Sequence, residues 1–294
     1  MDAFAALEQG LQKRPGNLTV FCSYFPGAGK SYAMLRAAEK ERQLGKDVVA
    51  GLLSNSQWPQ TEKLAETFER AACKKIIQNG RHVQELDLDA CLARRPQLVL
   101  IDDLPHTNTA DARHMKRYQD IEELLEAGVD VYTTMDIQQV ESIQDVVLPI
   151  LGCAVKERIP DRVFDRAAFV EFIDIEPLAL QKRLLSQNKT ALLANRPLSQ
   201  LHALREIGLR RCADRAALYT KQSPAKKTYR THEHILVCLS SAPSNEKIIR
   251  TAARMAGAFQ CRFTALFVET KELQQMPAAD KNRLRANIHL AQQL

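Results

Sequence analysis

The sequence predicts an α/β protein built on a mostly parallel β-sheet, with a second, smaller α/β unit near the C-terminus. The prediction rests mainly on two short apolar strands, Leu18–Cys22 and Gln97–Ile101. Each strand is followed directly by residues that suit ligand binding. Apolar residues at helical spacing follow the first strand after a short turn, as in a strand–turn–helix unit. A further strand–helix–strand–helix pattern begins after residue 231. Alternation of strands and helices in this way is typical of parallel sheets.

A glycine-rich turn links the first strand to its helix. Met34, Leu35 and Ala38 follow the turn at helical spacing. Backbone N–H groups at such a turn can surround a phosphate, while a lysine neutralises its outer oxygens and a hydroxyl ligates Mg²⁺. We therefore predict a P-loop NTPase-like site for ATP, with Lys30 as the cation and Ser31 on Mg²⁺. The predicted phosphate-binding residues are Pro26, Gly27, Ala28, Gly29, Lys30 and Ser31.

Tyr24 departs from the full phosphate-loop pattern, which has glycine at that place. We expect the bulky ring to narrow the pocket. The alternative is an ordinary strand-to-helix turn without a ligand.

A second strand ends in two acids, Asp102 and Asp103. Ligands of open α/β sheets bind at the carboxyl ends of the strands. We predict that Asp102 holds Mg²⁺ and that the catalytic role, orienting a water or accepting a proton, belongs to Asp103. Two solvated acids at a strand end are the alternative.

The elements between and after these motifs follow from periodicity and turn residues. We expect strands at Val48–Leu53, Lys74–Ile77, Val129–Thr134, Ala154–Glu157 and Phe169–Ile175. Thr133 and Thr134 then end a strand on the ligand edge and are predicted to bind the cofactor. We expect helices from Met1 to Gly16, Gly29 to Gly45, Pro59 to Cys73, Leu86 to Arg94, around Ile121–Leu125, and from Leu198 to Lys221.

The loop after the acidic strand carries histidines and a basic run at Arg113–Arg117. Phosphate sensing and an ordinary solvated surface are both open for this segment. The polar stretch Gln222–Arg230 is the predicted linker, so we expect domains at 1–221 and 232–294. The second domain, with strands at Ile235–Leu239 and Phe263–Val268 and helices at Asn245–Ala258 and Lys281–Leu294, is predicted to be incomplete.

Composition restricts the class of protein. The chain has 294 residues, 45% of them hydrophobic and 26% charged, with a net charge of +6 that is not gathered into one basic run. We expect no nucleic-acid partner, since no zinc spacing or other nucleic-acid motif is present. The seven scattered cysteines favour buried free thiols in a reducing compartment. No apolar run has the length of a membrane span and no signal-peptide pattern is present, so we expect a cytoplasmic location.

Several ordered stretches resemble one family, the N-terminal cytoplasmic region of the potassium-responsive sensor histidine kinase KdpD. The resemblance runs from about Leu18 to Arg215, and His234–Thr270 is similar to the universal-stress-protein domain of that family. The matching stretches are Pro26–Leu35, Leu86–Ala90, Ala93–Pro96, His106–Asn108, Lys116–Leu125, Ala127–Thr134 and Ala203–Arg215. The resemblance implies an ATP-binding input module of a kinase that regulates a potassium pump. It also implies partners in the membrane and kinase parts of a homodimeric full-length protein.

The chain departs from the family pattern at four places. The family has a small residue at Tyr24, Glu-Thr-His-Gly-Arg at Ser54–Trp58, Asp-Glu at Asp102–Asp103, and Asn-Val-Gln-His at Asp136–Gln139. The shorter Asp103 and the missing glutamate and histidine affect catalysis more than binding. Two functions remain open: a regulatory module that binds ATP, and an active NTPase or kinase that transfers phosphate to a hydroxyl.

Some family members carry a cyclic-di-AMP motif in the stress-protein domain, Ser-x-Ser and then Phe-Thr-Ala-x-Tyr. Here Ala242 and Phe267 replace one serine and the tyrosine. The matching residues are Ser240, Ser241, Phe263, Thr264 and Ala265. The resemblance implies cyclic-di-AMP as a second ligand, whereas plain strand packing explains the same alternation.

Overall fold

A computed structural model describes residues 14–53, 58–71, 73–78, 81–193, 196–221, 234–259, 261–269 and 276–294. Several predicted features lie outside these ranges and stay predictions. They are most of the helix over Met1–Gly16, the segment Ser54–Gln57, the turn Asn79-Gly80 and the linker Gln222–Arg230.

The chain forms two compact units, each described by itself. The first comprises the described part of Met1–Cys22 with Gly29–Met135 and Ala167–Ile173. The second comprises Ser23–Ala28, Asp136–Arg166 and the described part of Asp174–Leu294. The domain boundaries predicted from the sequence, 1–221 and 232–294, stay a prediction.

A six-stranded sheet forms the centre of the first unit, in the order β3-β2-β6-β7-β1-β8. The pairings of β2 with β3, β2 with β6, β6 with β7 and β1 with β8 are all parallel. The predicted α/β fold with a mostly parallel sheet is therefore confirmed. The strands are β1 (Leu18–Ser23), β2 (Val48–Leu52), β3 (Glu69–Arg70), β6 (Leu98–Ile101), β7 (Asp130–Asp136) and β8 (Phe169–Phe172).

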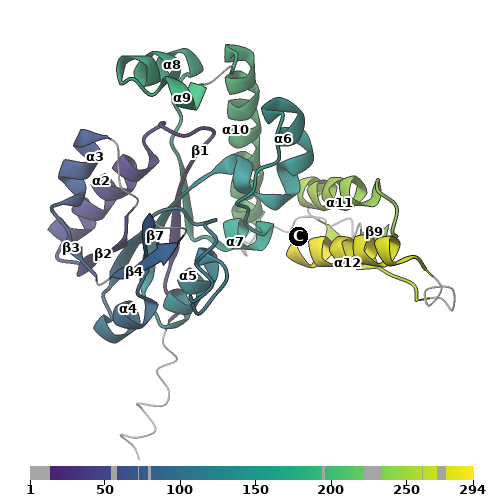
Figure 1. The fold of residues 1–294 in the computed structure, drawn as a ribbon, viewed down its shortest axis with the longest axis horizontal. Helices are drawn as coiled ribbons and strands as arrows, with labels where there is room; N and C mark the ends of the chain where they lie inside the picture. Colours follow the sequence, from purple (N-terminus) through teal and green to yellow (C-terminus); the bar gives the residue numbers. More distant parts are fainter. Residues whose placement is uncertain are drawn as a thin grey trace, which may run out of the picture. The chain divides into compact units, whose positions relative to one another are not determined.

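Helices lie on both faces of this sheet (Figure 1). The chain moves one way along the sheet from β1 through α2 (Lys30–Gln43) to β2, and the opposite way from β6 through α5 (Arg117–Glu126) to β7. Right-handed crossovers in opposite directions place their helices on opposite faces. The other helices in the described part of this unit are α3 (Pro59–Ala65) and α4 (Leu88–Arg94).

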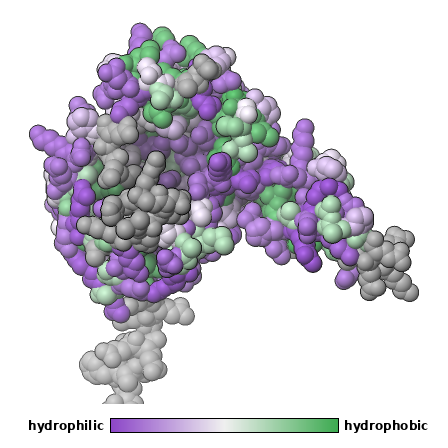
Figure 2. All heavy atoms as spheres, in the orientation of Figure 1, coloured by the Kyte–Doolittle hydropathy of each residue, from purple (hydrophilic) through white to green (hydrophobic). Residues whose placement is uncertain are grey.

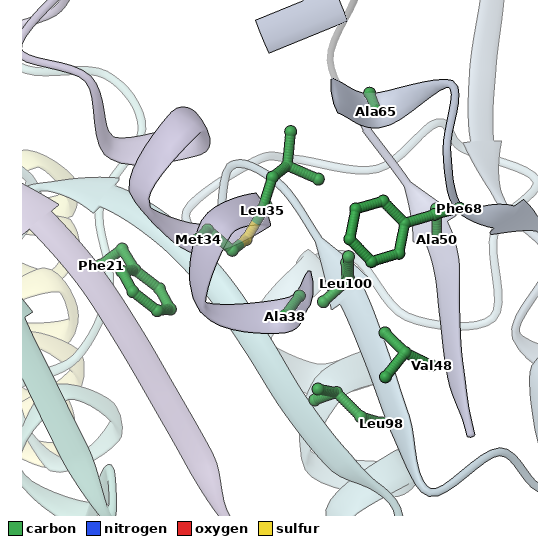
Figure 3. Close-up of a cluster of buried hydrophobic side chains, with 10 residues drawn as sticks. All are labelled: Phe21, Met34, Leu35, Ala38, Val48, Ala50, Ala65, Phe68, Leu98 and Leu100. Atoms are coloured by element: carbon green, nitrogen blue, oxygen red, sulfur yellow. The ribbon is translucent and has the colours of Figure 1, made fainter. Parts of the chain in front are cut away.

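The main hydrophobic core lies between the sheet and the helices α2 and α3. Met34, Leu35 and Ala38, which are spaced for one helical face, point from α2 toward the strands (Figure 3). Their partners alternate along the strands, as period-two burial requires. The partners in the cluster are Phe21, Val48, Ala50, Ala65, Phe68, Leu98 and Leu100.

Two predicted elements are wrong, and one strand was not predicted. The helix that begins at Pro59 ends at Ala65, not near Cys73, and β3 follows because Glu69–Arg70 pairs with the edge of β2. The strand predicted at Lys74–Ile77 is confirmed as β4 (Cys73–Gln78), and it pairs antiparallel with β5 (Arg81–Leu86), which was not predicted. The stretch Ala154–Glu157 forms no strand.

The second unit is mainly helical. Helix α10 has the predicted bounds, and β9 and β10 form a parallel pair whose core contains Val237, Ile249 and Leu290. Its elements are η1 (Ile137–Gln139), η2 (Glu141–Ile143), α6 (Gln144–Leu151), α7 (Asp161–Arg166), α8 (Pro177–Ser186), α9 (Thr190–Leu193), α10 (Leu198–Lys221), β9 (His234–Cys238), α11 (Asn245–Phe259), β10 (Arg262–Leu266) and α12 (Ala278–Gln293).

The surface is mostly hydrophilic in the view of Figure 2, with apolar patches over α6 and α8. Within the described ranges, no helix combines the length and apolar character that crossing a bilayer requires. All seven cysteines are free thiols, as predicted, but only Cys22 and Cys91 are buried, and Cys153 and Cys238 are exposed.

Candidate functional site

The turn between β1 and α2 adopts a conformation that only glycine reaches easily. Gly27 has φ +87° and Gly29 has φ +108°, both in the left-handed region where a Cβ atom meets steric strain. Gly29 caps α2 without any side-chain hydrogen bond, and the first residues of the helix include no acid. The first helical bond runs from the Ala33 N–H to the Gly29 carbonyl, 2.9 Å away. Backbone N–H groups at the N-terminus of a helix point along its axis and can bind an anion.

Tyr24 anchors the start of this turn. Its ring is fully buried, and its hydroxyl donates a hydrogen bond to the Ile175 carbonyl over 2.8 Å. Burial raises the pKa of the phenol to about 12, so the hydroxyl stays protonated as a donor at neutral pH. The ring is thus held in the interior of its own unit.

The predicted Mg²⁺ ligands lie close together in the first unit. The Ser31 hydroxyl, in the first turn of α2, lies 3.2 and 3.3 Å from the two carboxylate oxygens of Asp102. Asp102 directly follows β6 and is only 6% exposed. The helix start and the acidic strand end therefore meet, although β7 lies between β1 and β6 in the sheet.

Thr134 completes this group, while Thr133 does not. The β6–β7 register pairs Ile101 with Thr133, so Asp102 and Thr134 are the next residues along their chains. The Thr134 hydroxyl donates a hydrogen bond to the Asp102 carboxylate. Successive strand residues point to opposite faces, so Thr133 points away from Thr134. The Thr133 hydroxyl is buried and has no hydrogen-bond partner among the described residues.

Asp103 differs from its neighbour in exposure and in backbone conformation. Its carboxylate is 43% exposed and lies 3.8 Å from the His106 ring. Its φ is +63°, unusual for a residue with a side chain, and its N–H donates to the Thr134 hydroxyl over 3.1 Å. Residues held in this region cluster at functional sites. The buried Asp102 carboxylate suits the predicted role of cation ligand. The exposed Asp103 carboxylate suits the predicted role of orienting a water or accepting a proton.

Arg117 and Glu85 lie behind the acidic strand end, and Glu85 was not predicted from the sequence. Arg117 donates to the backbone carbonyls of Asp102 and Asp103, at 3.0 and 3.3 Å, and to the Glu85 carboxylate at 3.3 Å. Burial raises the pKa of Glu85, but the hydrogen bond from His106 and the charge of Arg117 outweigh it and lower the pKa overall. Nothing in the sequence near Glu85 indicates this contact.

The donor atoms brought together here suit Mg²⁺. Hard divalent cations prefer oxygen ligands, and Mg²⁺ in nucleotide sites takes one or two protein ligands besides phosphate oxygens and waters. The Ser31 hydroxyl and the Asp102 carboxylate are such ligands. In the described part of the chain, no group of three or more His, Cys, Asp or Glu side chains could hold a metal by itself. The donor set therefore fits a metal shared with a nucleotide.

The residues of the cyclic-dinucleotide motif lie on β10 and in the turn after the adjacent strand β9. Phe263 packs against the small core of this region, as the packing alternative requires. Thr264 bonds the His234 ring at 2.7 Å, and the Ser240 carbonyl accepts from Asn287 at 2.8 Å. Ala265 pairs with Val237 across the two strands, and the Ser241 carbonyl accepts from Arg283.

Comparisons with known proteins give a consistent result. A family model described as "KdpD: Osmosensitive K+ channel His kinase sensor domain" matches residues 14–216. The chain is 42% identical over 293 residues to a sensor protein KdpD of Clostridium acetobutylicum, and 38% over 299 residues to that of Escherichia coli (strain K12). It is 39% identical over 262 residues to a putative sensor protein KdpD of Synechocystis.

These matches cover different shares of the relatives. The match to the Clostridium protein covers 96% of this chain and 32% of the relative. The match to the Escherichia protein covers 98% and 33%, and the match to the Synechocystis protein covers 87% and 71%. The chain thus spans about a third of the length of the Clostridium and Escherichia relatives.

Proposed function

The chain belongs to the KdpD sensor-domain family, and from this premise we propose that it is a regulatory input region that binds Mg·ATP in a potassium-responsive sensor kinase. One observation carries the proposal: the Ser31 hydroxyl lies 3.2 Å from the Asp102 carboxylate at the N-terminus of α2. This arrangement combines backbone donors for phosphate with oxygen ligands for a cation.

Each residue of the site has a distinct part in the proposal. Gly27 and Gly29 shape the turn so that its N–H groups face the phosphates, and Lys30 adds a positive charge to them. Ser31 and Asp102 would hold Mg²⁺, and Thr134 orients the Asp102 carboxylate by its hydrogen bond. Bound Mg²⁺ would supply charge neutralisation of the phosphate oxygens.

Calorimetric titration of the chain with Mg·ATP tests the proposal. The variant Lys30→Ala is expected to bind about ten- to a hundredfold more weakly, since a hydrogen bond from a charged group contributes about 1.5–3 kcal/mol. Lys40→Ala is the matched control, because Lys40 is exposed near the other end of the same helix. Equal affinities for the wild type and Lys30→Ala would overturn the assignment of the phosphate loop.

An active P-loop enzyme, either an NTPase or a kinase that transfers phosphate to a hydroxyl, is the second candidate. The exposed Asp103 carboxylate, held at positive φ beside the buried Asp102, favours it. A carboxylate in that place can orient a water or accept a proton. Release of phosphate from ATP by the wild type but not by Asp103→Asn would support catalysis.

A cyclic-dinucleotide function is a separate part of the proposal and concerns the turn after β9. The Ser240 and Ser241 segment follows a parallel strand, where α/β units bind phosphates, and Arg283 lies against it. Titration of the full-length protein with cyclic-di-AMP should show weak binding that Ala242→Ser strengthens by restoring the motif hydroxyl. No binding by either protein would leave strand packing as the explanation of the motif.

The proposed setting of the module follows from the relatives. The Clostridium and Escherichia relatives are sensor proteins about three times as long as the matched region. We infer that the module acts on the membrane and kinase parts of a homodimeric full-length protein, on its cytoplasmic side. Size measurement and autokinase assays of the full-length protein, with and without Lys30→Ala, test this role.

A further inference from the structure

Arg117 lies directly behind the acidic strand end without belonging to the proposed nucleotide site. It is the first residue of α5 and is only 4% exposed. Its Nη1 atom lies 3.0 Å from the carbonyl oxygen of Asp102 and 3.3 Å from that of Asp103. One guanidinium nitrogen therefore contacts two consecutive carbonyl groups, at the point where the chain turns from extended to left-handed.

This turn determines where the two carboxylates point. At Asp103 the backbone has φ +63°, and the Asp103 N–H is bonded to the Thr134 hydroxyl. The Thr134 hydroxyl in turn donates to the carboxylate of Asp102. A small rotation of the Asp102–Asp103 peptide would therefore change both the carboxylate position and its hydrogen bond.

Glu85 and His106 hold Arg117 in place. The other guanidinium nitrogen, Nη2, lies 3.3 Å from Glu85, whose second carboxylate oxygen lies 3.2 Å from the His106 ring. The backbone N–H of Arg117 also donates a hydrogen bond to the backbone carbonyl of His106, over 3.0 Å. Arg117 and Glu85 are both nearly inaccessible to solvent, so each requires the other as a counter-charge.

We propose that Arg117, held by Glu85, is a positioning residue that sets the affinity of the Asp102 carboxylate for the divalent cation of the bound nucleotide. The inference rests on the proposed Mg·ATP function, because Asp102 is there the carboxylate ligand. Arg117 acts through the backbone of Asp102 and Asp103 and touches neither the cation nor the phosphates.

The competing interpretation is a buried ion pair that only stabilises the fold. The two interpretations predict different effects of replacing Arg117 on cation binding and on ATP binding. A positioning residue changes cation affinity and leaves cation-free ATP binding intact, because the phosphate-binding turn belongs to other elements. A loss of fold stability weakens both by the same factor.

Mn²⁺ is the probe: the electron paramagnetic resonance of the free ion is measured with the chain in excess over ATP, and a titration of the same ATP without the chain is subtracted. Removal of the partners that orient a metal ligand typically weakens metal binding by about 10–100-fold. We expect that loss for Arg117→Lys, whose single ammonium group cannot contact two carbonyls and Glu85 together. Affinity for ATP in EDTA should stay within about twofold of wild type, since no ligand of the phosphates is changed.

Arg113→Lys is the matched control. Arg113 lies four positions earlier, in the loop before α5, is 44% exposed and pairs with Asp89 and Glu123 rather than with the acidic strand end. Its Mn²⁺ affinity should equal that of wild type. Arg117→Lys with wild-type Mn²⁺ affinity overturns the inference, as does an equal loss of Mn²⁺ and cation-free ATP binding. A wild type that binds no ATP at all instead overturns the proposed function, and the inference with it.

A second variant covers the case in which Arg117→Lys does not fold. Glu85→Gln keeps the side-chain size and one acceptor oxygen but removes the charge that holds the guanidinium. It should weaken Mn²⁺ binding by a smaller factor in the same direction, with unchanged cation-free ATP affinity. An unchanged Mn²⁺ affinity in a folded Glu85→Gln protein counts against the inference.

Discussion

Replacing Asp103 by glycine separates the cost of its backbone conformation from the value of its carboxylate. Asp103 has φ +63°, which an L-residue adopts at a cost of about 1–2 kcal/mol, with aspartate at the lower end. Glycine removes that cost. It also adds conformational entropy to the unfolded chain, which offsets about 0.5–1 kcal/mol of the gain.

The contact between the Asp103 carboxylate and the His106 ring is weak. The carboxylate is 43% exposed, and its 3.8 Å approach to His106 contributes at most a few tenths of a kcal/mol in solvent. The hydrogen bonds of the Asp103 N–H and carbonyl belong to the backbone and remain in the glycine variant. Together, these contributions predict that the free energy of unfolding of Asp103→Gly lies between the wild-type value and about 1 kcal/mol above it. An average substitution, in contrast, destabilises a protein by about 1 kcal/mol.

Urea unfolding of wild type, Asp103→Gly and Asp103→Asn measures this difference. Asparagine also tolerates the left-handed region, so Asp103→Asn should match the wild type while losing the charge. Arg95→Gly, at the left-handed C-cap of α4 with φ +51°, is a comparator outside the site and should gain stability. Destabilisation of Asp103→Gly by more than about 1 kcal/mol would refute the strain reasoning. ATP turnover by Asp103→Asn at the wild-type rate would show that the carboxylate is not catalytic.

Three further predictions concern catalysis, acid stability and thiol chemistry. Any ATP turnover is expected to be slow, and Asp103→Glu should raise it, because a displacement of about 1 Å can cost about a hundredfold in rate; a phosphate-release assay decides this. The folded-state pKa of Glu85 lies below its ordinary value of 4.5, so its stabilising effect is present above that pH and is lost as pH falls through the lower, folded value. Urea unfolding of Glu85→Gln should therefore depend less on pH below 4.5 than that of wild type, and identical pH dependence would contradict it. Burial raises the pKa of the Cys91 thiol to about 11, so mass spectrometry after brief native alkylation should find it unmodified and should find label first on the exposed Cys153 and Cys238.

Sequence patterns predicted the elements whose signals are local. Strand β1 is a β-branched and aromatic run, and α2 has three buried residues at helical spacing and a C-terminal glycine with φ +89°. The helices α10 and α11 were predicted within one residue because their apolar periodicity is long. In each case the information lies within a single helix or strand and the residues that flank it, so no distant contact is needed.

Elements that depend on distant partners were missed. Glu69–Arg70 becomes a strand only because the edge of β2 is free to pair with it, and Phe68 enters the core beside it. No proline or glycine ends the preceding helix, so the sequence between Ala65 and Cys73 carries no stop signal. The strand β5 is a different case, because it pairs with β4, which directly precedes it in the chain, and the Asn79-Gly80 sequence between them is a local signal for a hairpin.

In the candidate site, too, some residues could be predicted from local patterns, whereas the placement of others depends on contacts between distant parts of the chain. Lys30, Ser31, Asp102 and Asp103 were predicted because phosphate and Mg²⁺ chemistry requires those residue types at strand ends. Thr134 was predicted together with Thr133, and only the register of β6 and β7 distinguishes them, because it places one threonine beside Asp102 and turns the other away.

The position of β7 between β1 and β6 also explains why the site needs support from residues outside the phosphate-binding turn and the acidic strand end. The phosphate-binding turn and the acidic strand end belong to strands that are not neighbours, so no ladder hydrogen bonds join them directly. Contact between them depends on the Ser31 hydroxyl reaching Asp102 across the end of β7. The orientation of Asp102 must then come from side chains behind it, and Thr134 and Arg117 bind it there from two different elements. Since Arg117 is held by Glu85 from β5, a segment outside the main sheet is connected through two hydrogen bonds to the residue that would bind the cation.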